Sequence, residues 1–151
     1  MSRVAVWMAT LGPVGWWPAG PGTLASALVT LGWWWAAPSR VAALVAAAAF
    51  TGAGLLAAGA ADRDLGPDDG RIVIDEAAGM ALALSGVPPG LPGCLLALAL
   101  FRVLDIAKPP PVSWCESVPG GPGVMLDDVV AGALAALIGA AAFALWPSLA
   151  G

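Results

Sequence analysis

Two short segments of this sequence place a pair of acidic residues directly before an apolar run. The pairs are Asp75–Glu76 and Asp127–Asp128. Acids at a helix N-terminus complement the helix dipole, and this structural role accounts for one acid in each pair. It accounts poorly for two, because charges beside lipid are costly. With no histidine in the chain, four carboxylates form a hard oxygen site suited to Mg²⁺, and we predict that all four residues bind this ion.

A glycine lies one helical turn after each pair, at Gly79 and Gly132. Small residues allow helices to approach closely, so these two glycines predict that the acidic pairs meet. Asp105 is expected to assist the metal. Asp62 and Asp64 are the next candidate ligands.

Arg102, Asp105 and Lys108 are spaced so that they share one helical face, and Pro109 ends that helix. Two interpretations are open at this point. The face is either a set of surface ion pairs, or Arg102 and Lys108 bind a phosphate group beside the metal. We expect the second role, with Lys108 as the main phosphate clamp.

A Pro-Gly turn ends at Gly22 and Thr23. Glycine lets backbone amides approach an anion, and threonine often caps a helix N-terminus. We therefore predict that Gly22 and Thr23 contact the phosphate, and that helix 23–37 begins here. The turn over 119–123 is similar and is expected to be a tight loop before the second acidic pair.

The composition excludes several classes of protein. The chain has 151 residues, of which 60% are hydrophobic and 11% charged, with a net charge of −4, and its mean hydropathy is +0.87. An ordinary soluble domain is about 25% charged. These values exclude a disordered tail and a nucleic-acid-binding protein. The two cysteines, Cys94 and Cys115, indicate no disulfide framework and are assigned no role.

The apolar runs predict helices. A bilayer core needs about 20 helical residues, and 41–61 and 129–147 satisfy this requirement. The helix over 23–37 carries three consecutive tryptophans, which favour a membrane interface. Residues 76–86 and 92–104 form a helical hairpin, because a Pro- and Gly-rich turn separates them.

The predicted fold is therefore all-α: one domain over residues 1–151, forming a small multi-helix integral membrane bundle with short or broken helices. Its polar site lies at one membrane face. Tracing the helices puts 62–75 and 105–128 on the same side. Five of the six basic residues fall on that side, with only Arg40 opposite, so the positive-inside rule makes it cytoplasmic.

Four blocks of the sequence resemble those of the phosphatidylglycerophosphatase A family, in the same order. They cover residues 21–23, 72–79, 101–109 and 121–132. The resemblance implies an all-helical, multi-pass, Mg²⁺-dependent enzyme of the bacterial inner membrane. It would remove the phosphomonoester of phosphatidylglycerophosphate and leave phosphatidylglycerol. The run of three prolines at 109–111 departs from the family pattern.

Carried onto this chain, the resemblance implies that the acidic blocks hold the metal and that Arg102 and Lys108 hold the phosphate. The expected reaction is metal-assisted hydrolysis, with Glu76 or Asp128 as general base. A covalent aspartyl-phosphate intermediate remains an alternative. The acyl chains of the phospholipid stay in the bilayer, and the oligomeric state is left open. The rival hypothesis is a membrane protein without catalytic activity, such as a small cation carrier, which would not need the two basic residues.

Overall fold

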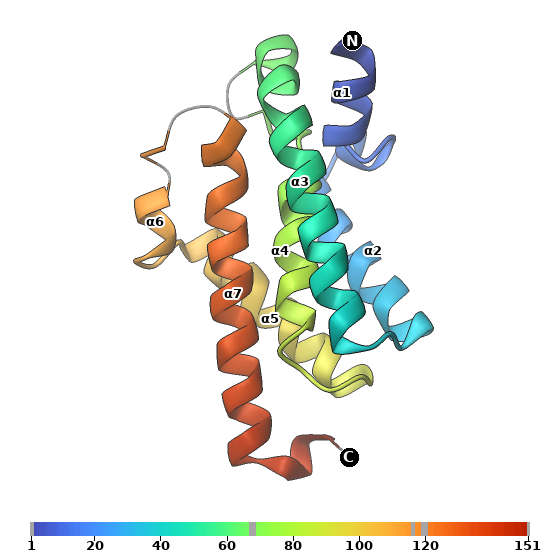
Figure 1. Ribbon diagram of the computed structural model, residues 1–151, viewed down its shortest axis with the longest axis vertical. Coiled ribbons are helices and arrows are strands. Elements are labelled where there is room, and N and C mark those ends of the chain that lie inside the picture. The colour runs from blue at the N-terminus through green and yellow to red at the C-terminus, as the bar shows by residue number, and fades with distance from the viewer. Residues whose placement is uncertain (1, 67–68, 116, 119–120, 151) are drawn as a thin grey trace.

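The computed structural model describes residues 2–66, 69–115, 117–118 and 121–150, and all regular structure in these residues is helical. Figure 1 shows a bundle of long helices with shorter helices at its periphery. The elements, in chain order, are α1 (Ser2–Ala9), η1 (Val14–Trp16), α2 (Pro21–Ala36), α3 (Arg40–Leu65), α4 (Ile74–Leu84), α5 (Leu91–Ala107), α6 (Val112–Cys115), α7 (Gly121–Leu145) and η2 (Pro147–Ala150).

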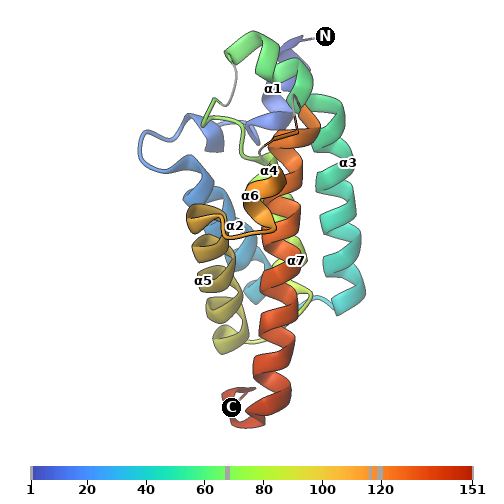
Figure 2. The same ribbon diagram turned by 90° about the vertical axis from the view of Figure 1, so that its left-hand side faces the viewer.

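Helix α4 occupies the centre of the bundle. It packs against α2, α3, α5 and α7, and Figures 1 and 2 show these helices on different sides of it. Nine of its 11 residues are buried, most of them alanine, glycine or another apolar residue. At 1.5 Å per residue α4 is about 16 Å long, which is too short to cross a bilayer. It is an interior helix, and it forms the first arm of the predicted hairpin.

Helices α3 and α7 are long and apolar enough to cross a membrane. Each contains an 18-residue window with a mean hydropathy of 2.1, and only 28% of that window is buried inside the protein. A core helix of a soluble protein would be mostly buried, whereas these helices expose large apolar side chains such as Leu56 and Leu137. Their composition and exposure together indicate membrane association.

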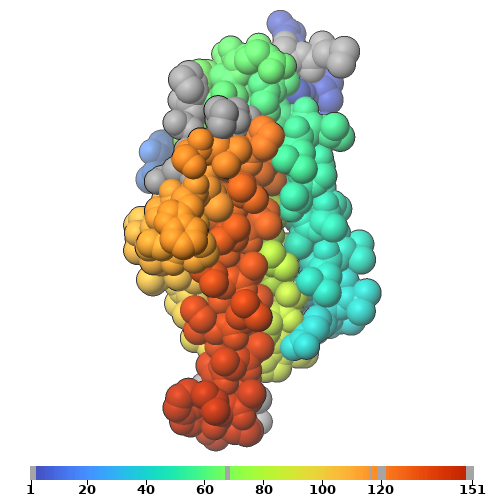
Figure 3. Space-filling view, turned by 60° about the vertical axis from the view of Figure 1, so that its left-hand side comes forward, coloured from blue at the N-terminus to red at the C-terminus, as the bar shows by residue number. Residues whose placement is uncertain are grey.

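The charged connections gather at one end of the bundle. Figure 1 shows the α3–α4 connection, the N-terminal helix and the first turn of α7 at the same end, with the α2–α3 and α4–α5 turns at the other. In the space-filling view of Figure 3, α6 lies on the side of α7 that faces away from α3. Which membrane face the charged end occupies stays a prediction.

Several helix boundaries differ from those expected. Helix α3 continues to Leu65 instead of ending at 61, so Asp62 and Asp64 are helical and do not lie in a loop. Helix α7 begins at Gly121 and not at 129, so the expected tight loop over 119–123 is helical from Gly121 onward. Proline is tolerated in a first helical turn, where its missing N–H would have no partner. The short helices α1 and α6 were not predicted.

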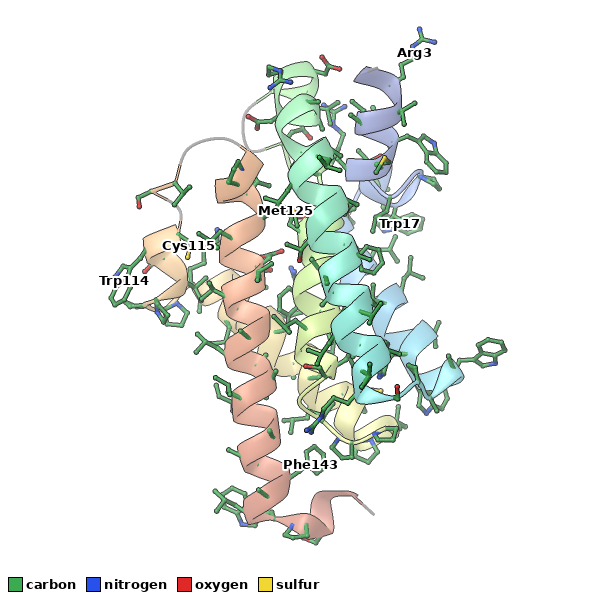
Figure 4. All side chains as sticks on the ribbon, in the orientation of Figure 1. Arg3, Trp17, Trp114, Cys115, Met125 and Phe143 are labelled. Atoms are coloured by element: carbon green, nitrogen blue, oxygen red, sulfur yellow. The ribbon has the colours of Figure 1, made fainter. Side chains whose placement is uncertain are left out.

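Glycines set the spacing between α4 and α7. A Cβ atom on Gly132 would collide with the backbone carbonyl of Gly79, and one on Gly86 would collide with the carbonyl of Ala136. This is the close approach that the sequence predicted for Gly79 and Gly132. Higher along α7, Met125 points toward α3 (Figure 4), where it fills the space beside Gly54.

We predict that Gly132→Ala lowers the midpoint of thermal unfolding in detergent, because the added methyl group forces α4 and α7 apart. Overpacking of this kind costs about 2 kcal/mol. The matched control is Gly52→Ala in α3, where a Cβ would meet nothing within 4 Å. Alanine at that position should be neutral or stabilising by up to about 1 kcal/mol. Equal unfolding midpoints for Gly132→Ala and wild type would contradict the close packing of α4 against α7 at this glycine.

Candidate metal and phosphate site

Three carboxylates meet between α4 and α7. Asp75 and Glu76 lie in the first turn of α4, and Asp128 lies in α7. One oxygen from each comes within 4.8 Å of the others. Asp75 is 8% exposed and Asp128 is 4% exposed. This spacing and burial suit a cation held between two helices.

Each acidic pair fixes its own geometry through a backbone hydrogen bond. The Glu76 N–H donates to Asp75 Oδ1 at 3.0 Å, and the Asp128 N–H donates to Asp127 Oδ1 at 3.0 Å. Glu76 Oε2 is buried and has no hydrogen-bond partner among the residues that the structure describes. Buried polar atoms are normally paired, so an unpaired carboxylate oxygen in this cluster is a feature that a bound cation explains.

Two ion pairs border the cluster. Arg102 Nη1 lies 2.6 Å from Asp105 Oδ2, and Lys108 Nζ lies 2.7 Å from Asp127 Oδ2. Arg102 and Asp105 are mostly buried, whereas Lys108 keeps a third of its side chain exposed. The C-terminal turn of α5 therefore brings both predicted phosphate-binding cations to the acidic site. Both cations also form ion pairs, in agreement with the ion-pair interpretation of this face. They lie beside the acidic cluster as well, which is the position that the phosphate-binding interpretation requires.

Asp127 does not join the three clustered carboxylates. Successive residues of a helix point about 100° apart, so only Asp128 faces α4, and Asp127 reaches Lys108 across to α5. The start of α7 at Gly121 also places both acids well inside the helix and away from its N-terminus. The sequence predicted Asp127 as a metal ligand, whereas the structure gives it a direct contact with the phosphate-clamp candidate.

Lys108 has an unusual backbone conformation. It is the C-cap of α5, with φ 44° and ψ 53° in the left-handed region. Glycine is the usual residue at such a position, and other residues are strained there. The Lys108 side chain forms an ion pair with Asp127, a contact that glycine could not supply.

The N-terminus of α2 faces Glu76. Gly22 is buried, and a Cβ at this position would collide with the Glu76 carboxylate. Gly20, with φ 65°, is the N-cap and Pro21 is the first helical residue, so Thr23 is the third residue of the helix and not the expected cap. The amides of a first helical turn lack intrahelical acceptors and favour anions. Gly22 therefore packs against the acidic cluster, and Thr23 is exposed one residue further on.

The remaining predicted ligands lie apart from the cluster. Asp62 and Asp64 are in the last turns of α3, and neither belongs to the group of three carboxylates. The sequence reasoning also missed the pair formed by Asp69 and Arg71, whose guanidinium lies 4.6 Å from the centre of the Trp16 ring. The sequence signal for this ion pair was an acid and a base two residues apart, directly before the Ile-Val-Ile-Asp block.

Comparison with known proteins identifies the family. The model of the family described as Phosphatidylglycerophosphatase A matches residues 7–143, which is nearly the whole chain. The chain belongs to the phosphatidylglycerophosphatase A family. This membership places it among phosphatases, and it confirms the resemblance drawn from the four sequence blocks. No solved structure matches the chain significantly.

Individual relatives agree with the family assignment. A Bacteroides thetaiotaomicron protein that carries the provisional name phosphatidylinositol-3-phosphatase is 40% identical over 129 residues, covering 78% of this chain and 80% of the relative. Proteins named Phosphatidylglycerophosphatase A from Escherichia coli and Haemophilus influenzae are 42% and 41% identical over 77 and 73 residues. Each of these two alignments covers 45% of the relative's own length.

The position of each acid predicts its effect on metal binding. Asp128→Asn and Glu76→Gln keep the shape of the side chain but remove charge from the cluster, so each should weaken Mg²⁺ or Mn²⁺ binding at least tenfold. Asp127→Asn should change metal affinity much less, because this carboxylate contacts Lys108. Calorimetric titration of the purified protein with each metal measures the difference. Equal losses of metal affinity for Asp127→Asn and Asp128→Asn would contradict this difference between the two aspartates.

Proposed function

We propose that this protein is a Mg²⁺-dependent phosphatidylglycerophosphatase of the bacterial inner membrane, which hydrolyses phosphatidylglycerophosphate to phosphatidylglycerol and phosphate. One observation carries the proposal: a buried cluster of three carboxylates lies beside two basic side chains and a helix N-terminus. A cation site next to an anion site is the arrangement that a metal-dependent phosphatase requires.

The clustered residues Asp75, Glu76 and Asp128 would hold the ion, with Asp105 beside them. Their oxygen donors and the unpaired Glu76 Oε2 fit a hard divalent cation. When bound, Mg²⁺ would neutralise phosphate charge and lower the pKa of a coordinated water. The four acidic side chains carry only negative charge, so they could not neutralise the phosphate without the ion.

The protein's own cations and amides would hold the substrate phosphate. Lys108 would exchange its bond to Asp127 for a phosphate oxygen, and Arg102 has a buried Nε without a partner in the described part of the chain. The amides at Gly22 and Thr23 would contact another oxygen. Preorganised donors of this kind stabilise the charge that develops as the phosphoryl group is transferred.

Glu76 and Asp128 are the candidates for general base, since either carboxylate can accept the proton of an attacking water. A direct attack by water and a covalent aspartyl-phosphate differ in whether a phosphoenzyme forms. The acyl chains would remain in the bilayer beside the apolar faces of α3 and α7, and the positive-inside rule would put the site on the cytoplasmic face. A cation carrier would not need Lys108 or Arg102, which favours the phosphatase over that alternative.

The proposal predicts metal-dependent phosphate release from purified protein in mixed micelles. Phosphatidylglycerophosphate should be hydrolysed with Mg²⁺ and not after chelation with EDTA. Phosphatidylinositol 3-phosphate is the necessary comparison because of the Bacteroides relative. Faster hydrolysis of the inositol lipid would overturn the proposed substrate, and activity in EDTA would overturn the metal requirement.

A second prediction concerns Lys108→Met. Loss of a cation that contacts the transferred phosphoryl group should cost about 3 kcal/mol of transition-state stabilisation, which is roughly a hundredfold in kcat/KM. Its ion pair with Asp127 is partly exposed and contributes at most about 1 kcal/mol to folding, so thermal stability should change little.

Lys108→Gly is the matched control for the backbone. Glycine removes the left-handed strain and should raise the thermal midpoint while activity stays low. A variant that unfolds easily but keeps its turnover per folded molecule would make Lys108 structural.

A further inference from the structure

A pocket of about 360 Å³ opens beside the acidic site. Trp16, Trp17 and Pro21 form its apolar side, and Asp69 and Arg71 form its polar side. Trp16 is 56% exposed and Trp17 is 55% exposed, and Figure 4 shows Trp17 on the side of the bundle that carries α1 and α2. The proposed chemistry of phosphate hydrolysis uses none of these five residues.

The polar side of the pocket is a fixed pair of charges. Arg71 Nε and Nη2 donate to the two carboxylate oxygens of Asp69 at 2.8 and 2.5 Å, and the Arg71 backbone N–H donates to Oδ1 at 2.9 Å. The hydrogen bonds from Arg71 hold the pKa of Asp69 below its usual value, so the pair stays ionised. The guanidinium lies over the Trp16 ring. Nη1 donates no hydrogen bond within the described chain and remains available to a ligand.

Backbone contacts hold the pocket in shape. A Cβ on Gly15 would collide with the Arg71 carbonyl, so η1 and the segment around Arg71 are in direct contact. The Val73 N–H donates to the Ala9 carbonyl at 2.9 Å, and the Gly15 N–H donates to the Thr10 carbonyl at 2.8 Å. The Trp and Arg walls are thus preformed.

The pocket adjoins the acidic cluster along two chain segments. Pro21 precedes Gly22, which packs against the Glu76 carboxylate, and neighbouring Cα atoms are about 3.8 Å apart. Arg71 precedes Asp75 by four residues, and the connection between them is buried. The pocket and the acidic cluster therefore share the start of α2 as a common border.

We propose that this pocket binds the glycerol phosphodiester of the lipid headgroup, the portion between the reacting phosphomonoester and the acyl chains. The inference rests on the proposed function. Arg71 Nη1 would donate to a phosphodiester oxygen, and the faces of Trp16 and Trp17 would cover the glycerol carbons. The Asp69–Arg71 pair carries no net charge, so recognition of the phosphodiester rests on the directed hydrogen bond from Arg71 Nη1. The pocket thereby selects a lipid with two phosphates over phosphatidic acid, whose single phosphate is attached directly to diacylglycerol.

The test compares two substrates in one enzyme. In the double variant Asp69→Asn/Arg71→Gln, kcat/KM for phosphatidylglycerophosphate should fall about tenfold, mainly through KM, because one charge-assisted hydrogen bond is lost. The slower hydrolysis of phosphatidic acid should stay within twofold of wild type. An equal fall for both lipids, or no fall for either, would overturn the proposal.

Two further arms separate the pocket from membrane anchoring and from the proposed reaction. Trp16→Leu should reproduce the substrate-selective loss, whereas Trp35→Leu, which removes an exposed tryptophan at the end of α2, should affect both lipids alike or neither.

Dihexanoyl-phosphatidylglycerol carries the phosphodiester without the phosphomonoester. Its calorimetric binding should weaken about tenfold in the double variant even if no lipid is hydrolysed, in which case the proposed function fails and the pocket stands. Unchanged binding would overturn the pocket.

Discussion

The burial of three carboxylates inside an apolar bundle is the constraint on which the rest of this structure depends. Each buried ion costs several kcal/mol unless charges of opposite sign and hydrogen bonds compensate it. The basic residues at the end of α5 lie beside the carboxylates, and the cation proposed above would supply further compensation. Charged side chains are few in this chain, and two of its six basic residues, Arg102 and Lys108, border the carboxylates.

Close packing and electrostatics are coupled through small residues. Asp128 and Gly132 lie one turn apart on α7, as do Asp75 and Gly79 on α4, so the glycine contact fixes the distance between the acids. Gly22 allows α2 to reach Glu76 in the same way. The absence of side chains at these three positions thus determines the geometry of the charged groups.

Patterns of residue type were sufficient to predict the helical class, the apolar helices, the central hairpin and the close approach of α4 and α7 at Gly79 and Gly132. These patterns were insufficient wherever the role of a residue depended on how its helix is rotated about its own axis. Asp127 and Asp128 are equivalent by composition, and only the rotation of α7 about its axis separates a clustered carboxylate from one that holds Lys108. The start of that helix was also misplaced, because a Pro- and Gly-rich segment resembles a loop until its packing is known. Contacts between distant segments, such as Trp16 with Arg71, leave no periodic signal in the sequence.

The shortness of α4 has a consequence for the biogenesis of the protein. A helix of 11 residues with two acids in its first turn cannot partition into lipid by itself. The face that carries Asp75 and Gly79 is covered when α7, which follows α4 in the chain, packs against it. The acidic interior between α4 and α7 is therefore completed only after α7 has been synthesised.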